Sequence, residues 1–197
     1  MDDNNSFVFP IIRKAERGRE TVNLDNAIDA WGTGDSASVR QDFRSMAERG
    51  DVIAQTVLGI VHRLGLGVAQ NYKEAFKWFW LAANQGNPTA QNNLGVMYID
   101  GEGARPDKTN SVKWFRLSAE QGNATAQLNL GAMYAHGSGV PQDNVTAHMW
   151  CSMSAANGCD EAKSYRDHLV EKMTLNEVSE AQQRFHENVA FNSQQNC

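Results

Sequence analysis

Apolar residues recur along this chain at helical spacing, three or four positions apart, instead of alternating with polar residues as they do in strands. Between residues 90 and 100 the apolar side chains fall on one helix face, and a second apolar face follows between residues 108 and 121. The two predicted helices end at Gly101 and Gly122, because glycine readily takes the left-handed conformation that ends helices. The pattern therefore predicts a helix, a short turn and a second helix.

This helix pair is repeated along the chain. Segments reading AQTVLG, AQNNLG and AQLNLG begin at Ala54, Ala90 and Ala126, at intervals of 36 residues. Further positions keep the same step: Gly59, Gly95 and Gly131; Gly65, Gly101 and Gly137; Gly67, Gly103 and Gly139; Trp78, Trp114 and Trp150; and Gly86, Gly122 and Gly158. Positions that move together in this way identify an internal repeat.

The repeat also predicts how the helices pack. Gly95 lies inside a predicted helix, where glycine costs about 1 kcal/mol relative to alanine. We interpret it as a point at which a neighbouring helix approaches too closely for a side chain. A single helix pair cannot bury its own apolar face, so neighbouring pairs stack to form the core. The sequence thus predicts an all-α solenoid.

The spacing divides the chain into consecutive parts. Three full repeats are expected at residues 51–86, 87–122 and 123–158. A degenerate first repeat covers residues 24–50, and residues 1–23 form an extension outside the pattern. Residues 159–197 form a degenerate capping helix pair and tail, because Arg166 and Asp167 replace the repeat's Leu and Gly and cannot enter a close-packed helix interface. Thr174 and Glu177 make a capping-box pattern for the last helix.

Charge and hydropathy restrict the binding partners. The chain carries 18 Lys and Arg against 23 Asp and Glu, a formal charge of -5, which argues against nucleic-acid binding. No stretch approaches the ~20 apolar residues that span a membrane. The polar, acidic start argues against a secretory leader. We expect a cytoplasmic protein, or a periplasmic or secreted one if Met1 replaces a removed leader.

No residue pattern indicates catalysis. The Gly-x-Gly pairs at Gly65, Gly101 and Gly137 recur with the repeat and follow no strand, so we interpret them as turns and not as phosphate loops. The histidines lack a pair four residues apart and lack partners at zinc-site spacing. No serine has a lysine three residues later, as a Ser-x-x-Lys nucleophile requires. We expect a protein without enzymatic activity, metal, cofactor or small-molecule substrate.

The string AQNNLGVMYIDGEGARPDKTNSVKWFRLSAEQGN, with its counterparts one repeat before and after, resembles the Sel1-like repeats, which are relatives of the tetratricopeptide repeat. The closing segment AANGCDEAKSYRDHLVEKMTLNEVSEAQ is similar to the end of bacterial members. The resemblance implies a right-handed superhelix that serves as an adaptor for a partner protein. The alternative that it implies is a bacterial immunity protein that neutralises a secreted toxin such as a lipase effector.

In the related tetratricopeptide modules the first helix of each pair lines a concave groove, and the resemblance places ten residues of this chain there. They are Thr56, Ile60, Arg63, Asn92, Val96, Ile99, Asp100, Leu128, Ala132 and His136. The apolar members would suit a helix or an extended segment of a partner. The alternative is that several of them pad the core.

Two cysteines leave two alternatives open. Cys151 takes the position of Phe79 and Phe115 in the repeat, and Cys159 follows eight residues later, beyond a predicted turn. Secreted cysteine-rich members of the family carry disulfides at this separation, placed four residues later in the repeat. The resemblance therefore suggests a Cys151–Cys159 disulfide, and the alternative is two ordinary thiols.

Overall fold

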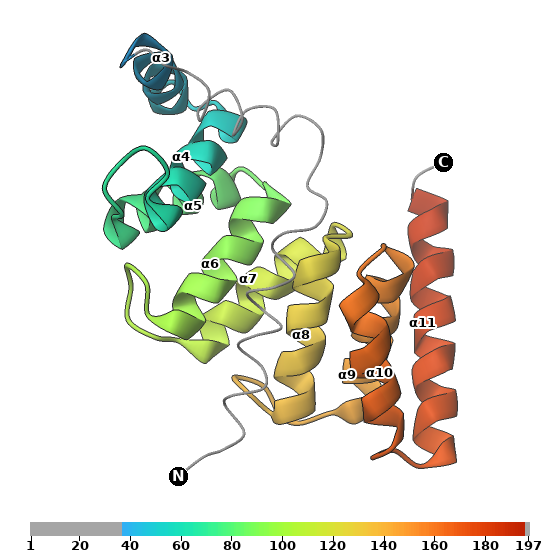
Figure 1. The fold of residues 1–197 in the computed structure, drawn as a ribbon. Coiled ribbons are helices and arrows are strands. Elements are labelled where there is room, and N and C mark those ends of the chain that lie inside the picture. The colour runs from blue at the N-terminus through green and yellow to red at the C-terminus, as the bar shows by residue number, and fades with distance from the viewer. Residues whose placement is uncertain (1–36, 196–197) are drawn as a thin grey trace. The chain divides into compact units, whose positions relative to one another are not determined.

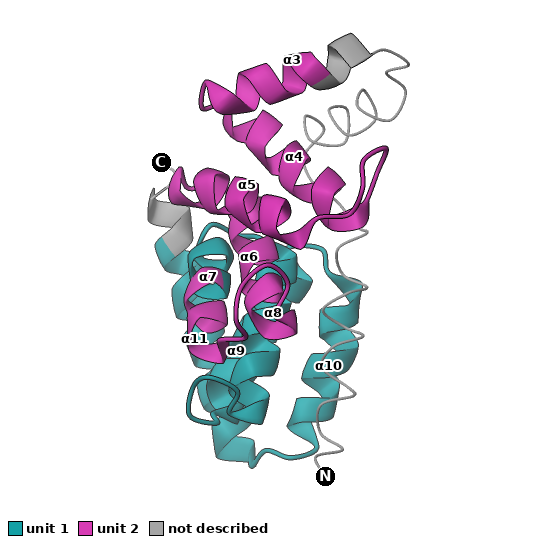
Figure 2. Cartoon of the chain, turned by 90° about the vertical axis from the view of Figure 1, so that its left-hand side faces the viewer, with its two compact units in different colours: residues 1–18, 115–197 teal, residues 19–114 magenta. Residues whose placement is uncertain are grey.

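The computed structural model describes residues 37–195, and every regular element in that range is an α-helix, as the sequence predicts. The predicted extension at residues 1–23 and the start of the degenerate first repeat lie outside the described residues. The described residues belong to two compact units, with the boundary between Trp114 and Phe115 (Figure 2).

Each unit is a run of helix pairs (Figure 1). Unit 2 contains α3 (Ala37–Glu48), α4 (Val52–Leu64), α5 (Tyr72–Asn84), α6 (Pro88–Asp100) and the first half of α7 (Lys108–Glu120). Unit 1 contains the second half of α7, α8 (Ala124–His136), α9 (Asn144–Ala156), α10 (Asp160–Val170) and α11 (Leu175–Gln195). The observed α6 and α7 match the predicted helices to within two residues at each end.

The same residues begin and end the first helix of every full repeat. Asp51, Asn87 and Asn123 each accept a hydrogen bond on the side-chain oxygen from the amide three residues later, at 2.8, 2.9 and 2.9 Å. Such an N-cap typically stabilises a helix by about 1 kcal/mol. The other ends lie at Gly65, Gly101 and Gly137, whose φ angles are 72°, 73° and 62°. The predicted glycine stops are therefore confirmed.

Interior glycines let successive helices touch. A Cβ atom on Gly59 would lie 2.5 Å from the ring of Phe79, and one on Gly131 would lie 2.7 Å from Sγ of Cys151. Real Cβ atoms do not approach other atoms so closely, so α4 meets α5, and α8 meets α9, at a point where only glycine fits. The close approach inferred at Gly95 is thus seen at the equivalent glycines of the repeat before and the repeat after.

A buried glutamine links three successive helices in each unit. In unit 1, Gln127 on α8 donates to the Ala119 carbonyl of α7 at 3.0 Å and accepts from Asn157, the C-cap of α9, at 2.9 Å. In unit 2, Gln55 does the same with Ala47 and Gln85, at 3.0 and 2.8 Å. Because a buried amide is costly unless its bonds are made, these contacts specify the register between neighbouring helices.

The last helix pair departs from the repeat. Cys159 stands at the N-cap position of α10 and makes no side-chain capping bond, unlike Asn123 at the start of α8. Only Ala162 and Leu169 of α10 are buried. The capping box of α11 is confirmed, since Thr174 and Glu177 exchange hydrogen bonds of 2.7 and 3.3 Å between backbone amide and side chain. Helix α10 is therefore attached through fewer apolar contacts than α8 is.

The close contact at Gly59 predicts an inverted effect of alanine. In an ordinary helix interior Gly→Ala stabilises by about 1 kcal/mol. Here we expect Gly59→Ala to lower the free energy of unfolding by about 1–3 kcal/mol, because the new methyl group would overlap the Phe79 ring. Urea unfolding of the full chain measures this, and in a Phe79→Ala background the same substitution should lose its penalty. An increase in stability on the wild-type background would contradict the close approach.

Candidate partner-binding site

The ten predicted groove residues all lie on the first helices of the repeats, and we call them the first-helix face. In unit 2, α4 carries Thr56, Ile60 and Arg63, and α6 carries Asn92, Val96, Ile99 and Asp100. In unit 1, α8 carries Leu128, Ala132 and His136. The structure therefore provides a seven-residue part in one unit and a three-residue part in the other.

Burial separates these residues into two groups. The buried ones are Thr56, Arg63, Asn92, Val96, Leu128 and Ala132. The half-buried or exposed ones are Ile60, Ile99, Asp100 and His136. Leu128 belongs to the core cluster of unit 1, and the Thr56 hydroxyl donates to the Val52 carbonyl of its own helix at 2.8 Å. For Leu128 and Thr56, the alternative that such residues pad the core is thus supported.

Arg63 makes a buried ion pair inside unit 2. Its Nε donates to the Glu102 carboxylate at 2.8 Å, with side-chain exposures of 8% and 17%, and its Nη1 donates to Asn93 at 3.0 Å. Asn93 lies on α6 and Glu102 lies in the loop that follows it, so Arg63 connects α4 to the next repeat. Sequence reasoning missed both partners, although an acid at 102 where the preceding repeat has Leu66 was a visible departure.

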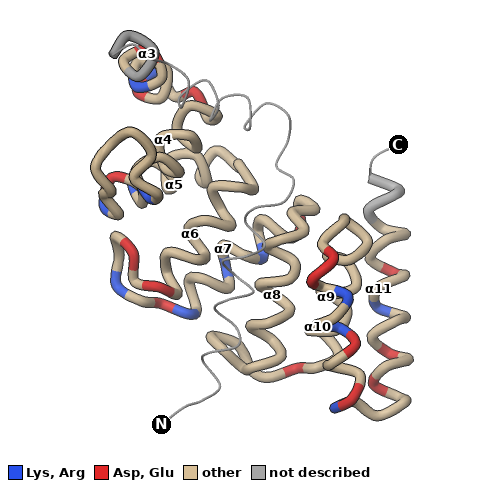
Figure 3. The backbone as a smooth tube through the Cα atoms, in the orientation of Figure 1, with Lys and Arg blue, Asp and Glu red and all other residues tan. Residues whose placement is uncertain are grey.

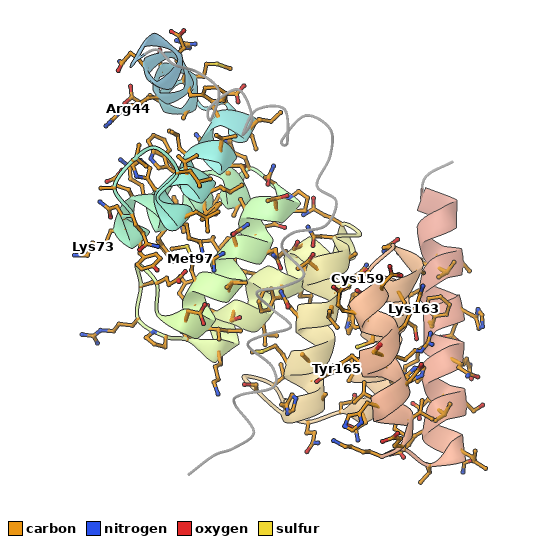
Figure 4. All side chains as sticks on the ribbon, in the orientation of Figure 1. Arg44, Lys73, Met97, Cys159, Lys163 and Tyr165 are labelled. Carbon is orange, nitrogen blue, oxygen red and sulfur yellow. The ribbon has the colours of Figure 1, made fainter. Side chains whose placement is uncertain are left out.

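His136 is exposed yet held in place. The Tyr165 hydroxyl of α10 lies 3.0 Å from its Nε2. Burial raises the pKa of Tyr165, and burial together with the Lys172 charge lowers the pKa of His136, so the bond joins a neutral phenol to a neutral imidazole near pH 7. Figure 4 labels Tyr165 on α10. Sequence reasoning missed Tyr165, whose counterpart in the second repeat is Asn93, the residue that contacts Arg63.

Charge is distributed unevenly over the first helices. Helix α8 carries no Lys, Arg, Asp or Glu, and α6 carries Asp100 alone. Helix α10 carries five such residues: Asp160, Glu161, Lys163, Arg166 and Asp167. Figure 3 shows the contrast between α8 and α10 within unit 1. The part of the first-helix face on α6 and α8 is therefore close to uncharged, whereas α10 presents both signs to solvent.

Of the two alternatives for the cysteines, the structure has the free thiols. Cys151 is fully buried and Cys159 is 9% exposed, within one core cluster of unit 1. Burial raises the pKa of both thiols, and Cys159 lies 3.6 Å from the Glu161 carboxylate, which disfavours a thiolate further. Burial outweighs the groups that would favour a thiolate, such as Arg166 beside Cys151, so neither sulfur has the low pKa of a reactive cysteine.

Between residues 37 and 195 there is no group of three or more His, Cys, Asp or Glu side chains arranged to hold a metal ion. None of the helices within that range combines the length and the apolar character that crossing a membrane requires.

Comparison with known proteins identifies the repeat. The Sel1 repeat model matches three consecutive segments, residues 52–87, 88–123 and 124–159, which together are more than half of the chain. The chain belongs to the Sel1 repeat family. The matched segments begin one residue after the full repeats that the spacing predicts. Sel1 repeat proteins generally serve as protein-interaction scaffolds, and their fold is typically non-catalytic.

Two solved structures show how similar the relatives are. A Sel1 repeat protein from Oxalobacter formigenes is 40% identical, over 65% of this chain and 96% of that one, with a TM-score of 0.60. The protein c5321, a protective antigen of uropathogenic Escherichia coli strains with the SLR fold, is 37% identical over 79% of this chain, with a TM-score of 0.65. This chain spans only 34% of the length of c5321. No curated protein matches the sequence.

The Arg63–Glu102 pair leads to a prediction about stability. Removing one partner of a buried pair leaves the other charge desolvated, at a cost of about 3 kcal/mol. We therefore expect Glu102→Gln to lower the free energy of unfolding by about that amount. The matched control is Glu180→Gln, since Arg184 and Glu180 are 42% and 52% exposed, and such exposed pairs contribute about 0–1 kcal/mol. Equal effects in urea unfolding would mean that Arg63 is not held by this pair.

Proposed function

We propose that this Sel1 repeat protein is a non-catalytic adaptor that binds a partner protein on its first-helix face. The observation that carries the proposal is membership of a family whose members generally serve as protein-interaction scaffolds. The residues that would contact the partner directly are the four of the face that are half-buried or exposed: Ile60, Ile99, Asp100 and His136.

The chemistry of these four residues favours a particular kind of partner. Ile60 and Ile99 offer apolar surface in unit 2, where Asp100 can accept hydrogen bonds from a donor or a cation. In unit 1, Tyr165 holds His136 in one orientation, which lowers the entropy that the imidazole loses on binding. An amphipathic helix or an extended segment with apolar anchors and a few polar groups would suit the part of the face in unit 2.

Paired variants test the location of the site. The first-helix variant is Ile99→Lys, Asp100→Lys and His136→Gln. The outer control is Trp80→Lys, Leu117→Lys and Glu120→Gln, at exposed positions of α5 and α7, and both variants raise the net charge by the same amount. With the full chain as bait in lysate of its source organism, we expect the partner bound by wild type to lose at least about tenfold in affinity, or 1.4 kcal/mol, only with the first-helix variant.

Two further results of this capture are informative. Loss with the outer control and retention with the first-helix variant would move the site to the second helices. The identity of the captured protein separates the adaptor from the alternative of an immunity protein. A single stoichiometric toxin, such as a lipase, would favour the immunity protein, whereas several related envelope or signalling proteins would favour a general adaptor. Melting curves of both variants confirm that lost capture is not lost folding.

A further inference from the structure

A histidine occupies an apolar position of the repeat in α9. The 36-residue step places His148 at the position of Phe76 and Val112. Phe76 packs against a core cluster of unit 2 and makes an edge-to-face contact with Tyr98, and Val112 is 4% exposed. His148 is also only 4% exposed. The fold therefore buries an ionisable ring where the other repeats have a side chain that cannot titrate.

One ring nitrogen of His148 lacks a hydrogen-bond partner among the described residues. Its Nδ1 is buried, and no group among the described residues hydrogen-bonds to it. Burial lowers the pKa of His148, and the nearby Arg166 charge lowers it further, while Asp167 opposes them. A proton on this ring would place a second positive charge near Arg166 of α10. The docked structure thus favours the neutral ring.

Charged groups reach His148 mainly from α10. Helix α9 packs against α8, α10 and α11. Arg166 and Asp167 come from α10. Helix α8 has no Lys, Arg, Asp or Glu; its titratable side chains are Tyr134 and His136, and His136 bonds to Tyr165. On α11, Arg184 contacts Thr146 of α9 and pairs with Glu180.

Helix α10 is also weakly docked on α9. It lacks a side-chain N-cap, it buries only Ala162 and Leu169, and Arg166 and Asp167 replace the Leu and Gly with which α8 meets α9. We propose that α10 is an acid-released cap, in which protonation of His148 undocks α10 from α9 and uncovers the core cluster around Leu128 and Cys151. The switch does not depend on which partner the first-helix face binds.

The direction of the pH dependence follows from the pKa. An undocked, solvated imidazole titrates near its usual value of about 6.5, and the docked one titrates lower. Docking of α10 is therefore at full strength above about pH 6.5 and weakens as the pH falls below that value, because the released state binds the additional proton.

The buried thiols report the release directly. We would label the full chain with 4,4′-dithiodipyridine, which reacts with thiols at acid pH, and follow Cys151 and Cys159 by peptide mass spectrometry at pH 7.5 and 5.5. After division by the rate of a free model thiol at each pH, we expect Cys151 in the wild type to react several-fold faster at pH 5.5, up to the limit of about tenfold that the binding of one proton over this range allows. No acceleration in the wild type would overturn the proposal.

Variants identify the responsible group. His148→Phe and His148→Val install the residue types of Phe76 and Val112, and both should reduce the acid effect to less than about twofold. His136→Gln removes the histidine that bonds to α10 through Tyr165 and should lower the acid effect by less than about twofold, whereas His186→Gln, at an exposed position of α11, is a surface control that should keep the full effect. Acceleration that survives in both folded His148 variants, or that disappears in His136→Gln, would overturn the assignment to His148. Circular dichroism at pH 7.5 verifies that each variant is folded.

Discussion

The stacking of this chain depends on the contact between an interior glycine of α4 or α8 and the helix that follows it. At Gly59 and Gly131 there is no room for a Cβ, because the Phe79 ring and the Cys151 sulfur occupy that space. Glycine weakens an isolated helix, so the helices gain their stability from the neighbours that the glycine admits. Once the backbones are this close, the side chain of Gln55 or Gln127 can reach the helix before it and the cap of the helix after it.

Polar groups inside the units align repeats and restrict where a partner can bind. Arg63 donates hydrogen bonds to Glu102 and Asn93, and it thereby joins α4 to the next repeat. In an interaction scaffold built from such helices, the same helices must hold neighbouring repeats together and contact the partner. Positions engaged between repeats keep the scaffold rigid, and half-buried positions such as Ile99 are the ones that can vary with the partner.

The departures from the repeat collect around α9 and α10. Cys151 replaces an aromatic residue, Cys159 replaces a capping side chain, and His148 replaces an apolar one. Charged residues likewise stand where α8 has its Leu-Gly pair. The change at Cys159 removes a capping bond that the earlier repeats have, and Asp167 replaces the glycine at which α8 meets α9, which is acceptable at the end of an array because no further repeat has to stack there. The same changes leave α10 more weakly docked than α8.

The sequence by itself determined the all-α architecture, the 36-residue period, the glycine stops and the capping box of α11, because each depends on residues close together in the chain or on spacing that recurs. It also identified the helices that carry the first-helix face. Only the tertiary structure decided which of those side chains remain accessible. Several features depend on contacts between different helices. They are the burial of Thr56 and Leu128, the pairing of Arg63 with Glu102, the hydrogen bond between Tyr165 and His136, and the free thiols of Cys151 and Cys159. Such contacts are set by how helices pack in space, and periodicity reports only the face on which a residue lies.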